Sequence, residues 1–273
     1  GGAWRHRTQN TSWYNEGVSA KRGARKEFPA VAVIVAAYEN LTIYDGDDPN
    51  LPMWMDFDYG SSGLASMTML YANGKGVFAL NGVICSVGSA GWHDGLTAID
   101  FIADNAKWRN SSYIANWAIG IGNRNVAGGY GSFITAPNEL IVNGSVNDVA
   151  MTVLPNAPIE TSTGLPVPTI AVATDSGTSI IKDDGSVVDI VYTGSPNTAY
   201  VDFRKSDNAI VMSMNSNGSY VHVIYDIPTS NISGSQNYQK EGIDDEFYRT
   251  GSSSDWNQDV WIYAASPFGG TTV

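Results

Sequence analysis

Three aspartates gather at one turn of the chain, at Asp45, Asp47 and Asp48. Carboxylates at this spacing, with a glycine after the first, are typical of the start of a calcium-binding loop. Such a loop ends on a glutamate at its twelfth position, where this chain has Asp56, and prolines interrupt the residues between. We therefore predict a plain acidic turn and no metal site, with a calcium site at these three aspartates as the alternative. No cofactor is predicted.

A second group of chemically capable side chains is Trp92, His93 and Asp94, which follow one another between two glycines. The other histidines, His6 and His222, are too far away in the sequence to complete a metal cluster by spacing. An aromatic ring, an imidazole and a carboxylate in one turn can face a ligand. Trp92, His93 and Asp94 are therefore the candidate ligand-binding residues, and the ligand is unknown.

Motifs for catalysis are missing from the sequence, which has no Gly-x-Ser-x-Gly turn and no phosphate-binding loop. The single cysteine, Cys85, lies in an apolar run and is expected to act as a small buried hydrophobe. Acids cluster at Asp56 and Asp58 and at Asp100 and Asp104, with no spacing that singles out a pair. We predict no catalytic residue and no enzyme. A pair of carboxylates that cleaves glycosidic bonds is the alternative.

These residues must be positioned by short strands, because β-branched runs alternate with Gly- and Asp-containing turns along the chain. The clearest stretch is Thr169–Asp189, in which three apolar runs are separated by two tight turns, the pattern of an antiparallel meander. Similar hairpins begin near residues 33, 84, 170, 210 and 261, so their spacings are 51, 86, 40 and 51 residues. Three of these spacings approach the ~40–50 residues of a propeller blade.

The sequence therefore predicts an all-β fold, a β-propeller of four-stranded antiparallel blades that is either complete or incomplete in this chain. Strands are also expected at 66–70 and at 52–57. The predicted blades cover residues 28–60, 64–109, 149–194, 198–228 and 259–273 of a domain that spans 28–273. Two insertions, at 110–148 and 229–258, separate them, and the first of these is either a loop or a degenerate blade.

A blade is covered on both faces by its neighbours, so the middle strands should be buried. We expect this of Ile170, Val172, Val33, Val35 and Val211. The chain begins without a methionine and stops in the last predicted hairpin, so we expect it to be an internal or processed piece of a longer polypeptide.

Charge is unevenly distributed in this chain of net charge −12. Residues 1–27 contain six Lys or Arg and two Glu, whereas the remainder contains nine basic and 25 acidic residues. An acidic body repels nucleic acid and anionic membrane, and no apolar run is long enough for a membrane span. The basic, aromatic segment 1–27 is either a docking arm or the first strand pair of the propeller, at 4–8 and 12–15. Its interface candidates are Trp4, Arg5, Arg7, Trp13 and Tyr14.

Residues 1–16, 27–55 and 146–190 resemble a propeller-like region of tail-associated virion proteins, tail fibres or spikes, of tailed bacteriophages. This resemblance implies a location in the virion tail, synthesis in the bacterial cytoplasm and assembly as a homo-oligomer with other virion proteins. A host surface polysaccharide is a further possible partner. The resemblance carries over no functional residue.

We therefore expect a structural or host-recognition component of a phage tail. A glycan-degrading tailspike enzyme is the alternative, and a propeller domain of a bacterial surface protein is a third reading.

Overall fold

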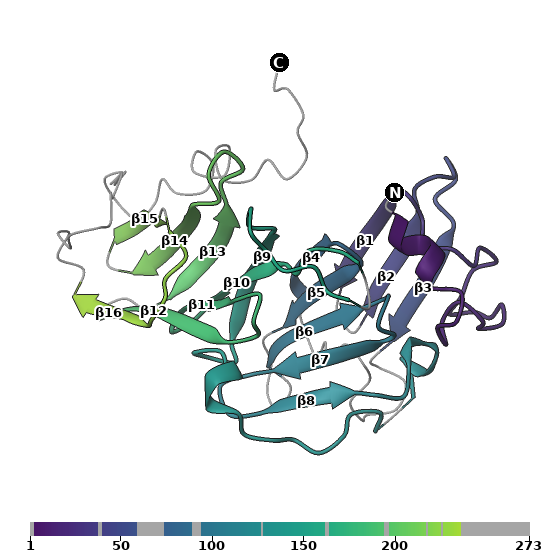
Figure 1. Ribbon diagram of the computed structural model, residues 1–273, viewed down its shortest axis with the longest axis horizontal. Coiled ribbons are helices and arrows are strands. Elements are labelled where there is room, and N and C mark those ends of the chain that lie inside the picture. Colours follow the sequence, from purple (N-terminus) through teal and green to yellow (C-terminus); the bar gives the residue numbers. More distant parts are fainter. Residues whose placement is uncertain are drawn as a thin grey trace.

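The computed structural model describes residues 3–37, 40–58, 74–88, 94–126, 128–161, 164–193, 197–216, 218–224 and 226–235 (Figure 1). Apart from three short 3-10 helices, every regular element in these ranges is a strand. The prediction of a nearly all-β chain is therefore confirmed. Within the described ranges, no helix has the length and apolar character that crossing a bilayer requires.

The strands form four sheets that follow one another in the sequence. Sheet 1 contains β1 (Ala32–Ala37), β2 (Asn40–Asp45) and β3 (Met53–Asp58). Sheet 2 contains β4 (Gly74–Leu80), β5 (Val83–Gly88), β6 (Gly95–Asp100), β7 (Asn105–Arg109) and β8 (Ile114–Trp117).

Sheet 3 contains β9 (Val146–Thr152), β10 (Thr169–Thr174), β11 (Gly177–Ile181) and β12 (Val187–Thr193), and β16 (Ile232–Ser235) adds to β12 in parallel. Sheet 4 contains β13 (Thr198–Phe203), β14 (Ile210–Ser216) and β15 (Gly218–Ile224). All other pairings within the sheets are antiparallel between neighbours in sequence.

Turn residues explain the tight hairpins of these meanders. Asn81 and Gly82 join β4 to β5 with φ values of 51° and 81°, the left-handed conformations that a two-residue hairpin turn requires. Between β11 and β12, Gly185 has a φ of 82°. Its N–H donates to the carbonyl oxygen of Lys182 at 2.9 Å. This turn lies where the Asp-Gly pair predicted it.

Successive sheets pack against each other through separate apolar clusters. One cluster joins sheet 1 to sheet 2, a second joins sheet 2 to sheet 3, and a third joins sheet 3 to sheet 4. The first strands of the sheets also contact in order, β1 with β4, β4 with β9, and β9 with β13 (Figure 1). The sheets therefore meet along their first strands, and their later strands lie farther from this line of contacts.

Burial on both faces is confirmed for the middle of this row. Every residue of β10 is buried: Ile170 and Val172 face sheet 2, whereas Ala171 and Ala173 face sheet 4. The prediction is wrong for Val33 and Val35, which are 40% and 43% exposed. They lie on the outer face of sheet 1, which no other sheet covers within the described ranges.

Several predicted boundaries also need correction. The 110–148 segment, predicted as an insertion, contributes β8 to sheet 2, and the 229–258 segment contributes β16 to sheet 3. Within the described ranges the sheets contain three, five, five and three strands, so four strands per blade stays a prediction. The strand expected at 66–70 and the last blade at 259–273 lie outside the described residues. Val211, predicted to be buried, is half-buried.

Candidate functional site

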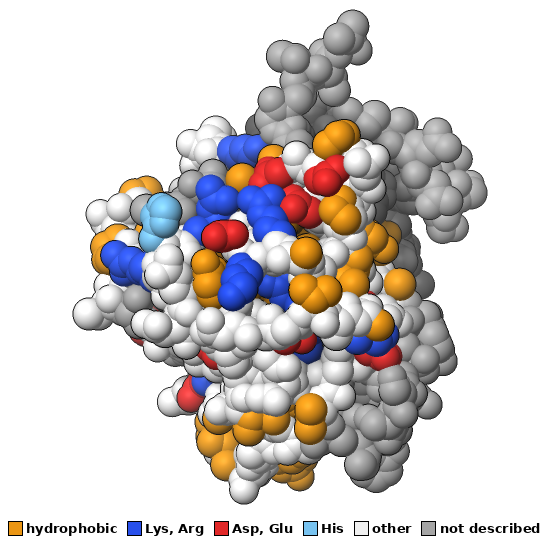
Figure 2. Space-filling model, turned by 90° about the vertical axis from the view of Figure 1, so that its right-hand side faces the viewer, with side chains coloured by type: hydrophobic (Ala, Val, Ile, Leu, Met, Phe, Trp, Pro, Cys, Tyr) orange, Lys and Arg blue, Asp and Glu red, His pale blue; other side chains and the backbone are white. Residues whose placement is uncertain are grey.

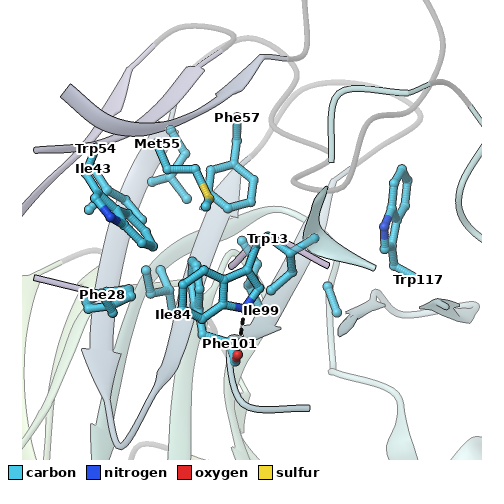
Figure 3. Close-up of a cluster of buried hydrophobic side chains, with 13 residues drawn as sticks. Trp13, Phe28, Ile43, Trp54, Met55, Phe57, Ile84, Ile99, Phe101 and Trp117 are labelled. Carbon is cyan, nitrogen blue, oxygen red and sulfur yellow. Dashed lines mark hydrogen bonds between the residues drawn. The ribbon is translucent and has the colours of Figure 1, made fainter. Parts of the chain in front are cut away.

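The N-terminal segment, residues 3–27, lies against sheets 1 and 2 of its own chain. The strand pair expected here is wrong, because Ala3–Arg7 forms a 3-10 helix and turns follow it. Trp13 is fully buried, and its indole Nε1–H donates to the carbonyl oxygen of Phe101 at 2.8 Å (Figure 3). Its ring meets Trp54 and Phe101 edge-on at 5.5 and 5.6 Å. The interface role predicted for Trp13 is therefore wrong, since the indole has no surface left for a partner.

Buried guanidinium groups fix the same segment to the sheets. Arg124 is 1% exposed, and its side chain donates to the carbonyl oxygens of Asp56 at 2.7 Å and Lys21 at 2.6 Å. Its Nη1 also contacts the carboxylate of Glu16 at 2.6 Å. Arg22 is 2% exposed, and burial lowers the pKa of its guanidinium to about 10. Part of the basic charge in segment 1–27 is therefore structural rather than available for docking.

The acidic turn at 45–48 binds groups of the protein itself. Arg25 Nη1 contacts Asp45 at 2.7 Å and Asp47 at 2.7 Å. Asp47 also accepts the backbone N–H groups of Ala30 and Val31, at 2.8 and 2.9 Å. These bonds lower the pKa of Asp47, with the N–H of Ala30 as the largest cause. The guanidinium of Arg25 therefore lies beside the two carboxylates at the place where a bound calcium ion would be expected.

Asp48 points elsewhere and accepts the backbone N–H of Asn50 at 2.8 Å. In the parts of the chain that the structure describes, no three His, Cys, Asp or Glu side chains come together in a way that could hold a metal ion.

Two of the other predicted interface residues, Trp4 and Arg5, line a pocket, here called the Trp4 pocket. It has a volume of about 150 Å³ and lies between the N-terminal 3-10 helix, the segment 28–30 and the β4–β5 turn. Its lining is formed by Trp4, Arg5, Phe28, Pro29, Ala30, Ala79, Leu80, Asn81, Gly82, Val83 and Ile84. Trp4 and Phe28 form one wall, with ring centroids 5.3 Å apart. Aromatic rings and a cation converge on this pocket, a combination that ligand sites use.

The remaining interface candidates lie outside this lining. Arg7 is exposed, and Tyr14 is half-buried with its hydroxyl 3.2 Å from Glu27.

The contacting first strands carry a polar chain that joins three sheets. Lys75 of β4 donates to Asn147 of β9 at 2.8 Å. The Asn147 amide donates to Asp175 at 2.9 Å and to the carbonyl oxygen of Thr198 at 3.0 Å. Asn197, immediately before β13, also donates to Asp175 at 2.9 Å. These hydrogen bonds link sheets 2, 3 and 4.

Among the carboxyl groups at this junction, Asp148 has the most strongly shifted pKa. Its carboxylate accepts the backbone N–H of Val201 at 3.1 Å, which ties β9 to β13. Burial raises the pKa of Asp148 to about 6, and the neighbouring Asp202 adds to the rise. Asp148 and Asp202 are both half-buried, and the bond from Val201 makes Asp148 part of the junction between sheets 3 and 4.

Of the predicted ligand-binding turn, Trp92 and His93 lie outside the described residues, and Asp94 is half-buried. The next residue, Gly95, lies so close to β7 that a Cβ there would be 2.9 Å from Nε1 of Trp108. Arg109 follows on β7 and is 7% exposed, with Nε and Nη1 buried and without an acceptor among the described residues. The sequence did not single out Arg109, because a basic residue at the end of a strand is usually solvated.

Comparisons with known proteins give no family. No protein-family model matches the chain, and no curated protein sequence matches it. The crystal structure of Hsv2 from Kluyveromyces marxianus is similar with a TM-score of 0.33 and 11% identity, over 75% of this chain and 62% of that one. Hsv2 from Kluyveromyces lactis is similar with a TM-score of 0.29 and 10% identity, over 82% and 80%. Likeness at this level supports no argument about function.

Proposed function

We propose that the chain is a β-propeller-type, non-enzymatic module of a bacteriophage tail that builds the particle and contributes to host recognition. The observation that carries the proposal is the ordered contact of the first strands β1, β4, β9 and β13. Sheets that meet along their first strands and bury apolar clusters between their faces are arranged as blades are around an axis.

A structural rather than catalytic role is supported by the way in which the polar groups are used. The polar chain from Lys75 to Asn197 and the bond from Val201 to Asp148 hold sheets together. The aspartates of the 45–48 turn bind Arg25 and backbone N–H groups. Groups with such partners stabilise a scaffold and are poorly placed to act on a substrate.

The location in a phage tail rests on the sequence resemblance. In this proposal the protein is made in the bacterial cytoplasm, is incorporated into the virion and binds other virion proteins and further copies of itself. The exposed Val33 and Val35 on the outer face of sheet 1 are apolar side chains of the kind that a contact with another copy buries. No cofactor, nucleic acid or membrane insertion is part of the proposal.

Immunogold labelling tests the location. An antibody against the folded protein should label the tails of purified particles of the phage that encodes it. Label that is absent from intact particles but present in the soluble fraction of the lysate would overturn the proposal.

The enzymatic alternative is tested by incubating the protein with surface polysaccharides of the host and measuring new reducing ends. We expect none above the level of a heat-denatured control. A time-dependent increase would favour a glycan-degrading spike.

A further inference from the structure

The Trp4 pocket has the size and shape to hold one ring. An apolar cavity of about 150 Å³ in another protein admits a benzene molecule, and the Trp4 pocket has a similar volume. Here the indole of Trp4 is half-buried and rests on the buried ring of Phe28, at a tilt of 58°, so Trp4 provides the accessible aromatic surface. Aromatic faces carry negative potential and attract the C–H groups on the apolar face of a ring ligand.

The charged side chain in the pocket lining is the guanidinium of Arg5, which forms no ion pair with a described carboxylate. Arg5 lines the pocket and donates from Nη1 to the carbonyl oxygen of Phe28 at 3.4 Å, a long bond that uses one of its five N–H groups. Within the described ranges, no carboxylate lies within ion-pair distance of Arg5, whereas Arg25 and Arg124 both have one. The pocket therefore offers a cation that a carboxylate on the ligand would complement.

The surroundings favour an anionic group here more than elsewhere on the molecule. Segment 1–27 carries a net charge of +4 in a chain of net charge −12. Figure 2 shows Lys and Arg side chains gathered on the side of the molecule where this segment lies, with acidic and hydrophobic side chains among them. A small acidic group is attracted to this side, while the acidic remainder of the chain disfavours a long polyanion lying across it.

We propose that the Trp4 pocket is a subsite for one carboxylate-bearing sugar ring, such as a uronic acid residue of a surface polysaccharide, with the ring against the indole of Trp4 and the carboxylate on Arg5. This inference rests on the proposed recognition function and gives it a ligand class and a place. A single ring of this size should bind weakly, with a Kd of about 1 mM. Repetition of the subsite in a homo-oligomer would strengthen binding to a polymer.

The test is an NMR titration of the full ¹⁵N-labelled chain, in which the indole N–H signal of Trp4 is assigned by its loss in Trp4→Phe. The probes are methyl β-D-glucuronide, the neutral methyl β-D-glucoside and benzoate. We expect the glucuronide to shift the Trp4 signal with at least ~10-fold higher affinity than either of the other two. Failure of the glucuronide to shift the Trp4 signal would overturn the proposal. Tighter binding of benzoate would also overturn it, because it would indicate an aromatic side chain of a protein partner as the occupant.

Two matched variants assign the carboxylate to Arg5. Arg5→Gln should lower the affinity for the glucuronide about 10-fold and leave that for the glucoside unchanged, since only the charged contact is lost. Arg7→Gln removes the same charge from an exposed residue of the same 3-10 helix that does not line the pocket, and it should leave both affinities unchanged. Equal losses in the two variants would overturn the assignment to Arg5.

The sugar titration and the immunogold labelling can refute the subsite and the tail assignment independently of each other. If immunogold labelling places the protein on tails while no sugar binds, the subsite is refuted and the structural role remains. If the glucuronide binds while particles carry no label, the subsite remains and the tail assignment is refuted.

Discussion

The indole Nε1–H of Trp13 donates to the carbonyl oxygen of Phe101, 88 residues farther along the chain, at 2.8 Å. This bond joins the N-terminal segment to the loop that follows β6, in the middle of a cluster of interlocking aromatic rings (Figure 3). Trp13, in a segment predicted as a docking arm or a first strand pair, is therefore part of the core between sheets 1 and 2.

Replacing Trp13 should destabilise the isolated chain. Trp13→Ala empties a fully buried site and is expected to lower the free energy of unfolding by about 3–5 kcal/mol. Trp13→Phe keeps most of the ring but leaves the carbonyl oxygen of Phe101 without its donor, at a cost of about 1–3 kcal/mol. Urea unfolding of the two variants measures both losses of unfolding free energy. Tyr14→Phe, which removes only an exposed hydroxyl contact, is the control and should change little. Unaltered stability of Trp13→Ala would return Trp13 to the interface hypothesis.

Arg124 should be essential for stability although it is a charged residue. Its guanidinium binds two backbone carbonyl oxygens and the carboxylate of Glu16. Arg124→Met would remove all three of these contacts, although the carbonyl oxygens of Asp56 and Lys21 would each keep one other donor, from Asn125 and from the N–H of Asp56. We expect a loss of roughly 2–4 kcal/mol in the free energy of unfolding, measured by urea titration. A loss smaller than that of a typical exposed Arg→Met change would show that these bonds contribute nothing.

Arg109 should behave in the opposite way. It is almost as buried as Arg124, yet Nε and Nη1 have no acceptor, and burial lowers its pKa. Arg109→Met keeps the length of the side chain and removes a buried charge of which two nitrogens, Nε and Nη1, have no acceptor among the described residues, so it should raise the free energy of unfolding by about 1–3 kcal/mol. The same titration with Arg124→Met alongside gives a matched pair of buried arginines. A destabilised Arg109→Met would mean that Arg109 has a partner that compensates for its burial.

Protonation of Asp148 should make stability depend on pH. The pKa of Asp148 is raised to about 6 in the folded chain, above the ~3.9 of an unfolded aspartate. The folded state therefore binds more protons than the unfolded state between pH 4 and 6, so this group contributes stability at low pH that is lost as the pH rises through 6. We expect Asp148→Asn to flatten the profile of unfolding free energy between pH 4 and 6.

A control of opposite sign is Asp207, whose pKa is lowered to about 2, chiefly by its bond with Arg204. Its contribution is present above pH 4 and is lost as the pH falls toward 2. Asp207→Asn should therefore change the profile only below pH 4. A parallel change in both variants would contradict the assignment to Asp148.

The strands were predictable where the local pattern alone decides the structure. The β10–β12 meander follows from β-branched runs broken by Ser-Gly and Asp-Gly turns, and burial on both faces was readable from the unbroken apolar run of β10. Val33 and Val35 show the limit, because β1 is equally apolar but lies at the end of the row of sheets. Whether a face is covered depends on another sheet, and that information is not in the strand itself.

The candidate site was less predictable for a similar reason. The sequence marks Trp4, Arg5 and Trp13 as the same kind of residue, aromatic or basic in one polar segment. The turn after the 3-10 helix sends Trp13 into the core, whereas Trp4 and Arg5 line a pocket with residues 79–84. The sequence did not distinguish Arg109 and Arg124 from the other arginines, because only the tertiary packing decides which arginines are buried.

Cryo-electron microscopy of the intact phage particle is the most direct test of the central claim, that the chain is a propeller-type module of the tail. We expect density for this chain in the tail, with β1, β4, β9 and β13 innermost and side by side around one axis. Density in which these sheets form two facing layers or the rungs of a parallel β-helix, or a tail that lacks the chain, would contradict it.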